Sequence, residues 1–284
     1  MSSQIFKANR TWFLNPAVLN DVALSKCYYH FMFGLWLPLL NLYRRGLFEK
    51  DQRVILLSQG QFNSQLKELN DAGISTLQTI PDIESLVAIE RIDGHVSHFV
   101  LDSLEAYFFT RGRFCVRPAA LDSDTLAELA KYGVSHFYRP PEKTYAVLII
   151  DRGDGDKGHG KNTRRIVNLE ELAGAVSNHF GWEVNVLTVE GMTMSEQISL
   201  FHSAKYVIAQ HGSVLGHLLW MRPDRSGVVE LLPEWFNREG WEYFSLLADA
   251  MGVSRVEVAQ PGPFSPAPID SVLAALQQLQ NLVH

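Results

Sequence analysis

Charged residues and glycines follow the apolar runs in the second half of the chain, where strands would end. Arg152 comes after the run at 145–150, and two more arginines close the loop behind it. His211-Gly212-Ser213 follows the run at 206–210, and Glu230 lies within the run at 227–232. Because ligands bind beside the carboxyl ends of strands in an open parallel sheet, we expect these residues at one edge. The candidate binding residues are Arg152, Arg164, Arg165, His211, Gly212, Ser213 and Glu230.

These residue types suit a nucleoside diphosphate. Arginine forks bind phosphate oxygens in pairs. Gly212-Ser213 at the start of a helix offers backbone N–H groups and a hydroxyl, and Glu230 offers a carboxylate to ribose hydroxyls. Alternatives stay open for single residues. Arg164 and Arg165 could lie in a solvated turn. His211 could be a hydrogen-bonded loop residue, and Glu230 could form a buried salt bridge.

Other motifs are absent from the sequence or incomplete in it. No phosphate-loop lysine motif or Gly-x-Ser-x-Gly turn follows a strand. Gly153, Gly155 and Gly158 have the G-x-G-x-x-G spacing, but charged residues interrupt this loop, so we do not interpret it as a dinucleotide-binding turn. His95, His98 and His159 lack the spacing of a metal site with a third ligand. Asp154-Gly155-Asp156 has the D-x-D spacing that can hold a divalent cation. Because lysines and arginines crowd the same glycine-rich loop, we expect solvated carboxylates there and no metal.

Short apolar runs alternate with amphipathic runs through the second half of the chain. This pattern predicts βαβ units and a parallel, Rossmann-like sheet. Capping boxes are predicted at Asn168/Glu171 and Thr193/Glu196. The predicted strands are 145–150, 182–189, 205–209, 227–232 and 254–258, and the predicted helices are 168–180, 193–202, 214–221, 238–251 and 269–283.

The first half has a looser pattern, which we interpret as a second α/β domain. Residues 28–43 form an almost wholly apolar helix in this prediction, and 61–70 and 121–131 form two more. The predicted strands are 53–57, 86–89 and 96–100. A Pro-rich break near residue 140 suggests domains at 1–140 and 141–265, with a terminal helix at 266–284 that packs back on the first domain.

Composition and charge narrow the function classes. The 284 residues are 46% hydrophobic and carry a net charge of −6, which argues against non-specific nucleic-acid binding. Two cysteines, Cys27 and Cys115, do not make a disulfide framework, so we expect a reducing, cytoplasmic location. The longest apolar run, 31–40, is shorter than the ~20 residues that span a bilayer. Peripheral association with the inner face of a membrane stays open.

Two segments and one short piece resemble glycosyltransferase family 61. The stretch EQISLFHSAKYVIAQHGSVLGHLLWMRPDRSGVVELLP (196–233) resembles the family's E-Q-x-x-x-F-x-x-A helix, H-G-A-G-L-T-N turn and V-V-E-x-x-P strand. Upstream, IIDRGDGDKGHGKNTRRIVNLEEL (149–172) resembles its arginine-rich segment, and CYYHF (27–31) its N-x-Y-H-F helix opening. The chain departs from the pattern at Ser213-Val214 and at His217, which replaces an asparagine.

The resemblance implies a GT-B-like fold, with two Rossmann-like domains facing a cleft. It further implies inverting, metal-independent transfer from a nucleotide sugar, expected to be UDP-linked, to a glycan or glycolipid acceptor in polysaccharide biosynthesis. No cofactor is expected. The base would come from the first domain, and His30 is favoured because the family-like helix opening places it and imidazole titrates near neutrality. Asp93 is the next candidate, followed by His95 and His98.

Two rival hypotheses come from the same residues. The altered HGSVLGH segment (211–217) would suit a non-catalytic member that binds a nucleotide or sugar and recruits a partner enzyme. The D-x-D sequence would suit a metal-dependent GT-A transferase. Release of nucleoside diphosphate separates an enzyme from a binder, and the effect of a chelator separates the two transferase classes.

Overall fold

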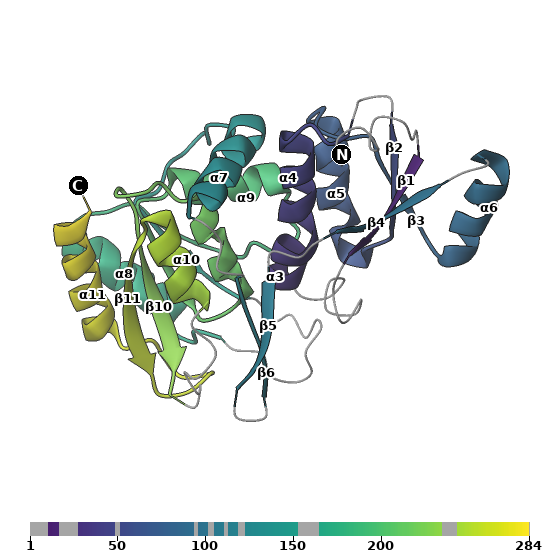
Figure 1. Cartoon of the computed structure of the whole chain (residues 1–284). Coiled ribbons are helices and arrows are strands. Elements are labelled where there is room, and N and C mark those ends of the chain that lie inside the picture. Colours follow the sequence, from purple (N-terminus) through teal and green to yellow (C-terminus); the bar gives the residue numbers. More distant parts are fainter. Residues whose placement is uncertain are drawn as a thin grey trace. The chain divides into compact units, whose positions relative to one another are not determined.

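The computed structural model describes residues 11–16, 28–48, 52–93, 96–101, 105–110, 113–118, 123–152, 165–234 and 243–283. The chain divides into two compact units, Met1–Ala106 and Tyr107–His284. Each unit holds a parallel sheet with helices, so the predicted α/β class is confirmed (Figure 1). This division falls before the break near residue 140, because helix α7 (Ser123–Phe137) packs on α9 (Met194–Ser203) of the second unit.

The first unit contains a four-stranded parallel sheet in the order β3-β2-β1-β4. This order matches the first four strands of the 3-2-1-4-5-6 order of a Rossmann fold, in which the order of the strands reverses beside β1. The strands are β1 (Thr11–Pro16), β2 (Arg53–Leu57), β3 (Leu77–Ile80) and β4 (Ser97–Leu101). A buried helical segment follows β1 and consists of α3 (Tyr28–Phe31), the π-helical η1 (Met32–Trp36) and α4 (Leu37–Arg44), as predicted for 28–43. Between β2 and β3 lie η2 (Gly60–Phe62) and α5 (Asn63–Asp71).

The predicted strand at 86–89 is wrong, because this segment belongs to helix α6 (Ile83–Asp93). Its β-branched residues suggested a strand, but Leu86 is buried while Val87 is exposed, as on one side of a helix. The Asp82 carboxylate accepts hydrogen bonds from the backbone N–H and the hydroxyl of Ser85, at 2.8 and 2.6 Å. These hydrogen bonds lower the pKa of Asp82 and cap the helix.

The second unit contains a five-stranded parallel sheet in the order β11-β10-β9-β7-β8. Counted along the chain, this is the 2-1-3-4-5 order of a doubly wound fold, with its switch point between β7 and β9. The strands are β7 (Val147–Ile150), β8 (Val184–Leu187), β9 (Tyr206–Gln210), β10 (Gly227–Pro233) and β11 (Ser254–Gln260). A separate two-stranded sheet consists of β5 (Glu105–Thr110) and β6 (Arg113–Pro118).

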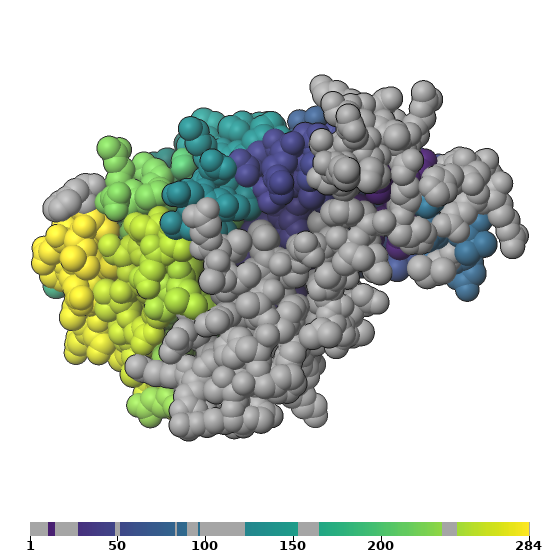
Figure 2. Space-filling view, in the orientation of Figure 1, coloured from purple at the N-terminus to yellow at the C-terminus, as the bar shows by residue number. Residues whose placement is uncertain are grey.

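Helices α8 (Leu169–Phe180) and α11 (Ile269–Leu282) cover one face of this sheet. Helix α10 (Tyr243–Met251) lies on the other side of β10 and β11 (Figure 1) and contacts the 3₁₀-helix η3 (Ser213–Trp220). The apolar side of α11, including Leu276 and Leu279, is part of the core of the second unit. The apolar side of the terminal helix, which was predicted to pack back on the first domain, thus packs within the second unit. The outer side of α11 forms part of the molecular surface (Figure 2).

One of the two predicted capping boxes is confirmed. At α9, Thr193 and Glu196 cap each other's backbone N–H groups. At α8, the Asn168 side chain makes no cap hydrogen bond. It instead accepts from the backbone N–H of Ala267 at 2.7 Å and donates to its carbonyl at 3.1 Å, so it ties the segment before α11 to α8. In the part of the chain that the structure describes, no helix is long and apolar enough to cross a membrane.

Candidate active site

The switch point of the second unit brings Arg152 and His211 together. Arg152 follows β7 and His211 follows β9, and these strands are neighbours in the sheet. The backbone N–H of His211 donates to the Leu231 carbonyl at 2.9 Å, which extends the pairing of β9 with β10 by one residue. The Arg152 guanidinium donates through Nη1 to the His211 carbonyl oxygen at 3.4 Å. A cation thus lies at the edge where a doubly wound sheet binds its ligand.

Gly212 makes room for this guanidinium. A Cβ atom on Gly212 would lie 1.8 Å from Nη1 of Arg152 and 3.0 Å from its Cζ. No side chain at position 212 is compatible with the observed place of Arg152. Glycine is therefore required here for close approach, and its extended backbone needs no special conformation.

The residues after Gly212 turn directly into a helix. Ser213, which is half-buried, is the first residue of η3, and the Leu215 N–H donates to the Gly212 carbonyl at 2.9 Å. Backbone N–H groups at the start of such a helix attract anions. Arg152 and the start of η3 therefore offer positive charge and donors beside the same turn.

Glu230 joins His211 to a third strand. One carboxylate oxygen, Oε1, accepts from Nδ1 of His211, and the other, Oε2, lies 3.1 Å from Nη1 of Arg255. The His211 and Glu230 side chains are only 4% and 3% exposed, so this pairing is sheltered from water. Both oxygens of Glu230 thus have charged or polar partners, which supports the salt-bridge alternative over the predicted contact with ribose.

Arg255 is the residue of this group that the sequence did not single out. It lies on β11 and contacts Glu257 as well as Glu230, with Nη1 and Nη2 at 2.7 and 2.6 Å from Oε1 of Glu257. A charged residue inside the predicted strand 254–258 was the available signal. Its partner could not be identified before the order and pairing of the strands were known.

Arg165 is linked to the same edge through its backbone. Its N–H donates to the Pro263 carbonyl at 2.8 Å, and that carbonyl also accepts from the side-chain amide of Gln210 at 3.0 Å. Gln210 is the last residue of β9 and directly precedes His211. The backbone of Arg165 is therefore held near the carboxyl end of β9 through Pro263, and its side chain is exposed.

The other predicted site residues lie elsewhere or outside the described part. His30 is half-buried on α3 in the first unit, two residues before the first residue of the π-helical turn η1. Asp93 is the last residue of α6 and His98 lies on β4, but their side chains are outside the described residues. Arg164, His95, Asp154 and Asp156 also lie outside them. Within the described ranges, no group of three or more His, Cys, Asp or Glu side chains could hold a metal ion.

The departure from the family motif at His217 lies in the core. The His217 ring is fully buried and stacks on Phe201, with ring centroids 4.4 Å apart. Burial lowers the pKa of His217 to about 3, so this imidazole is neutral near neutral pH. The substitution therefore changes packing behind η3 and does not remove a group from the edge that holds Arg152.

Comparison with protein families agrees with this geometry. Residues 28–229 match the family model described as Glycosyltransferase 61. The chain is therefore an enzyme of the glycosyltransferase class, which uses a sugar donor and an acceptor. Because the match spans more than half of the 284 residues, the chain belongs to glycosyltransferase family 61. The match includes His30, Arg152 and His211 and ends one residue before Glu230.

Comparisons with individual proteins add little to this assignment. No curated protein matches the chain. Among solved structures, the rubredoxin oxygen:oxidoreductase of the anaerobe Desulfovibrio gigas matches with 16% identity and a TM-score of 0.30. The match covers 70% of this chain and 47% of the oxidoreductase chain. A likeness at this level carries no argument about function.

Proposed function

We propose that this glycosyltransferase is inverting and metal-independent, and that it moves a sugar from a nucleotide-sugar donor, UDP-linked, to a glycan or glycolipid acceptor in polysaccharide biosynthesis. The observation that supports this most is the Arg152 guanidinium seated against Gly212 at the switch point of the sheet. Arginine binds diphosphate oxygens in a bidentate manner, and the start of η3 adds N–H donors next to it. This combination suits a leaving group that carries two phosphates.

The proposed reaction is a single displacement. The acceptor oxygen forms a bond to the anomeric carbon while the bond from that carbon to the diphosphate oxygen breaks. The electron pair leaves with the nucleoside diphosphate, and a base takes the acceptor proton. Arg152, Arg165 and the start of η3 would stabilise the negative charge that develops on the leaving oxygen. His211, oriented by Glu230, would complete this set of donors.

For the base we propose His30. It lies near the start of the helical segment that follows β1, and in a βαβ unit that end of the helix is near the carboxyl edge of the sheet. The π-helical turn η1 that follows α3 also supports a functional role for this segment, since such turns are frequent at functional sites. Asp93 is the alternative base.

The experiment is a thermal-shift screen with nucleotide sugars, followed by donor turnover in arginine variants. A donor at about 100 times its Kd should stabilise the fold by ~2.7 kcal/mol. Arg152→Met and Arg165→Met should each lower turnover by about 10²-fold, the usual cost of losing one charge-stabilising group. Arg225→Met is the matched control, because Arg225 is exposed and precedes β10 at the opposite, amino edge of the sheet.

Two results would overturn the proposal. Full turnover in both site variants would place the donor elsewhere. Binding of a nucleotide sugar with no release of nucleoside diphosphate, with or without acceptors, would support a non-catalytic member of the family.

A further inference from the structure

A line of charged residues runs from the edge strand of the second unit to the switch point. In the parallel pair β10 and β11, Glu230 is aligned with Glu257, and Val228 with Arg255. Since side chains alternate along a strand, Glu230, Arg255 and Glu257 lie on the same face of the sheet. The Arg255 guanidinium lies between the two carboxylates. Through its other oxygen, Oε1, Glu230 accepts a hydrogen bond from Nδ1 of His211.

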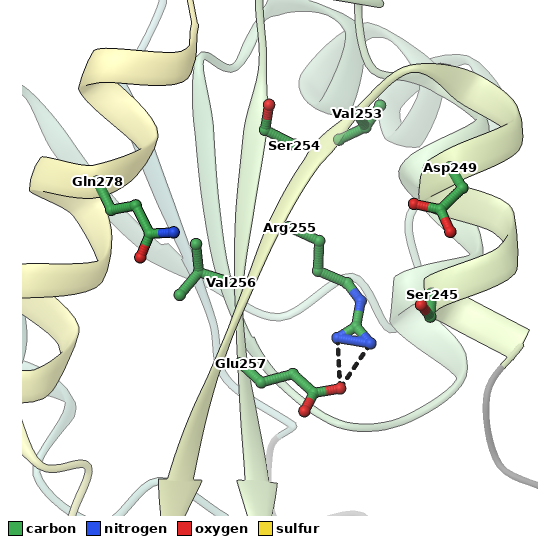
Figure 3. Close-up of a pocket in the computed structure, with 8 residues that line it drawn as sticks. All are labelled: Ser245, Asp249, Val253, Ser254, Arg255, Val256, Glu257 and Gln278. Atoms are coloured by element: carbon green, nitrogen blue, oxygen red, sulfur yellow. Dashed lines mark hydrogen bonds and ion pairs between the residues drawn. The ribbon is translucent and has the colours of Figure 1, made fainter.

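The outer end of this line reaches a pocket of about 450 Å³ beside β11. Figure 3 shows Arg255 and Glu257 joined in this pocket, with Asp249 of α10 also facing it. The Arg255 side chain is 14% exposed and Glu257 33%, whereas Glu230 is 3% exposed. The charge of Glu230 is thus buried, and its contact with Arg255 connects it to the molecular surface.

We propose that Arg255 is a positioning residue of the donor site, which sets the orientation and proton affinity of His211 through Glu230. The name donor site rests on the proposed function, but the charge balance around Glu230 does not depend on it. A buried carboxylate needs a compensating charge. With Arg255 in place, Glu230 can remain ionised and accept the Nδ1 proton of a neutral imidazole. Without Arg255, Glu230 must be balanced by a proton, taken up either by His211 as its second or by the carboxylate itself, so the His211–Glu230 pair holds a proton to higher pH.

No motif or family match identifies Arg255. It lies outside the matched residues 28–229, and its role follows from the pairing of β10 with β11. Among the described residues, charged or titratable groups face His211 and Glu230 from three further elements. They are Arg152 after β7, Arg255 on β11 and Tyr243 on α10, while Glu257 on β11 and Asp249 on α10 lie in the pocket beside Arg255.

The test is a pH titration of the His211 ring by NMR in the full chain without ligand. Its resonance is assigned as the one lost in His211→Asn. Arg255→Met removes a positive charge near Glu230 and should move the midpoint upward by about one pH unit or more. Glu257→Gln removes a negative charge and should move it downward, and Arg255→Lys should stay near wild type. Arg53→Met is the matched control, since Arg53 bonds Gln78 of a neighbouring strand through Nε and Nη2 in the first unit.

A second readout uses UDP as the probe. Because an imidazolium binds a diphosphate better than a neutral ring, UDP affinity in Arg255→Met should fall off at a higher pH than in wild type. The proposal would be overturned if the titration midpoint of His211 were unchanged in both Arg255→Met and Glu257→Gln, provided that both variants fold. If Arg255→Met does not fold, the midpoint in Glu257→Gln alone decides. Shifted midpoints in a protein that binds no nucleotide would overturn the proposed function and leave the role of Arg255 toward His211 intact.

Discussion

Replacement of Gly212 with alanine tests whether the place of Arg152 matters for catalysis. The new Cβ would lie 1.8 Å from Nη1, whereas real Cβ contacts are essentially never below 3.0 Å. The guanidinium must therefore retreat by at least 1.2 Å, the difference between these two distances. The backbone at Gly212 is extended, with φ 162°, so alanine adds no strain there.

The expected effect is a loss of turnover without a loss of stability. Misplacing a catalytic group by about 1 Å can cost ~10²-fold in rate, and loss of one charge-stabilising donor costs about 10²- to 10³-fold. We expect kcat/KM for the donor to fall about 10²-fold, or ~2.7 kcal/mol in transition-state stabilisation. Because the displaced atom is the far end of a flexible side chain, the free energy of unfolding should change by less than about 0.5 kcal/mol.

The assay measures release of nucleoside diphosphate from the donor, with the unfolding midpoint measured on the same samples. Gly174→Ala is the control, because a Cβ on Gly174 in α8 would have no atom within 4 Å. That variant should keep full turnover. Arg152→Met and the double variant Gly212→Ala/Arg152→Met complete a cycle, in which the alanine should add little once Arg152 is gone. Full turnover in Gly212→Ala, or losses that simply add in the double variant, would refute the reasoning.

Three further predictions concern the base, a buried histidine and the metal. His30→Ala should abolish transfer and leave UDP binding intact by calorimetry; loss of binding in a folded variant would remove His30 from the role of base. The pKa of His217 is lowered by burial from 6.5 to about 3, so its contribution to stability is complete above pH 6.5 and is lost as the pH falls toward 3. Between pH 7 and 5 wild type should lose about 2 kcal/mol that His217→Phe does not lose, as measured by urea unfolding, and equal pH slopes would contradict this. Transfer should persist in excess chelator and in Asp154→Asn/Asp156→Asn, whereas activity lost in chelator and restored by Mn²⁺ would exclude the metal-independent mechanism.

The layout of the second unit was predictable because its central strands, such as β7 and β9, are almost continuous apolar runs. Strand β7 is fully buried, and strands buried on both faces consist almost wholly of apolar residues. The positions of Arg152 and His211 followed from the general rule that ligands lie beyond the carboxyl ends of parallel strands. Their contact confirms that both residues lie at one edge.

Errors arose where a short pattern supports two local structures. The β-branched residues of α6 suit a strand, and the deciding feature is the Asp82 cap, a single side chain outside the run. Asn168 has the residue type of a helix cap, but its amide binds the backbone of Ala267, which is far along the chain. The Pro-rich linker before α11 did not show which sheet the helix would cover. For Asn168 and for α11 the outcome depends on a partner that is distant in sequence.

Arg255 shows the same limit for the site. Its contact with Glu230 depends on β11 lying next to β10 in a particular register, and the sequence alone does not specify the order of strands. The close approach of Arg152 to Gly212 likewise joins two loops far apart in the chain. Residue types could indicate a site that binds anions. The contacts of Glu230 with His211 and Arg255 could be identified only once the pairing of the strands was known.

The two proposed roles occupy equivalent topological positions in the two units. In the second unit, Arg152 and His211 flank the switch point between β7 and β9, where neighbouring loops diverge to opposite faces of the sheet. In the first unit, the order β3-β2-β1-β4 puts the switch point beside β1, and His30 belongs to the helical segment that follows that strand. Each sheet thus has candidate groups at the topological position where doubly wound folds bind ligands. A transferase needs groups for a diphosphate and for an acceptor hydroxyl, and we propose that the two switch points supply them.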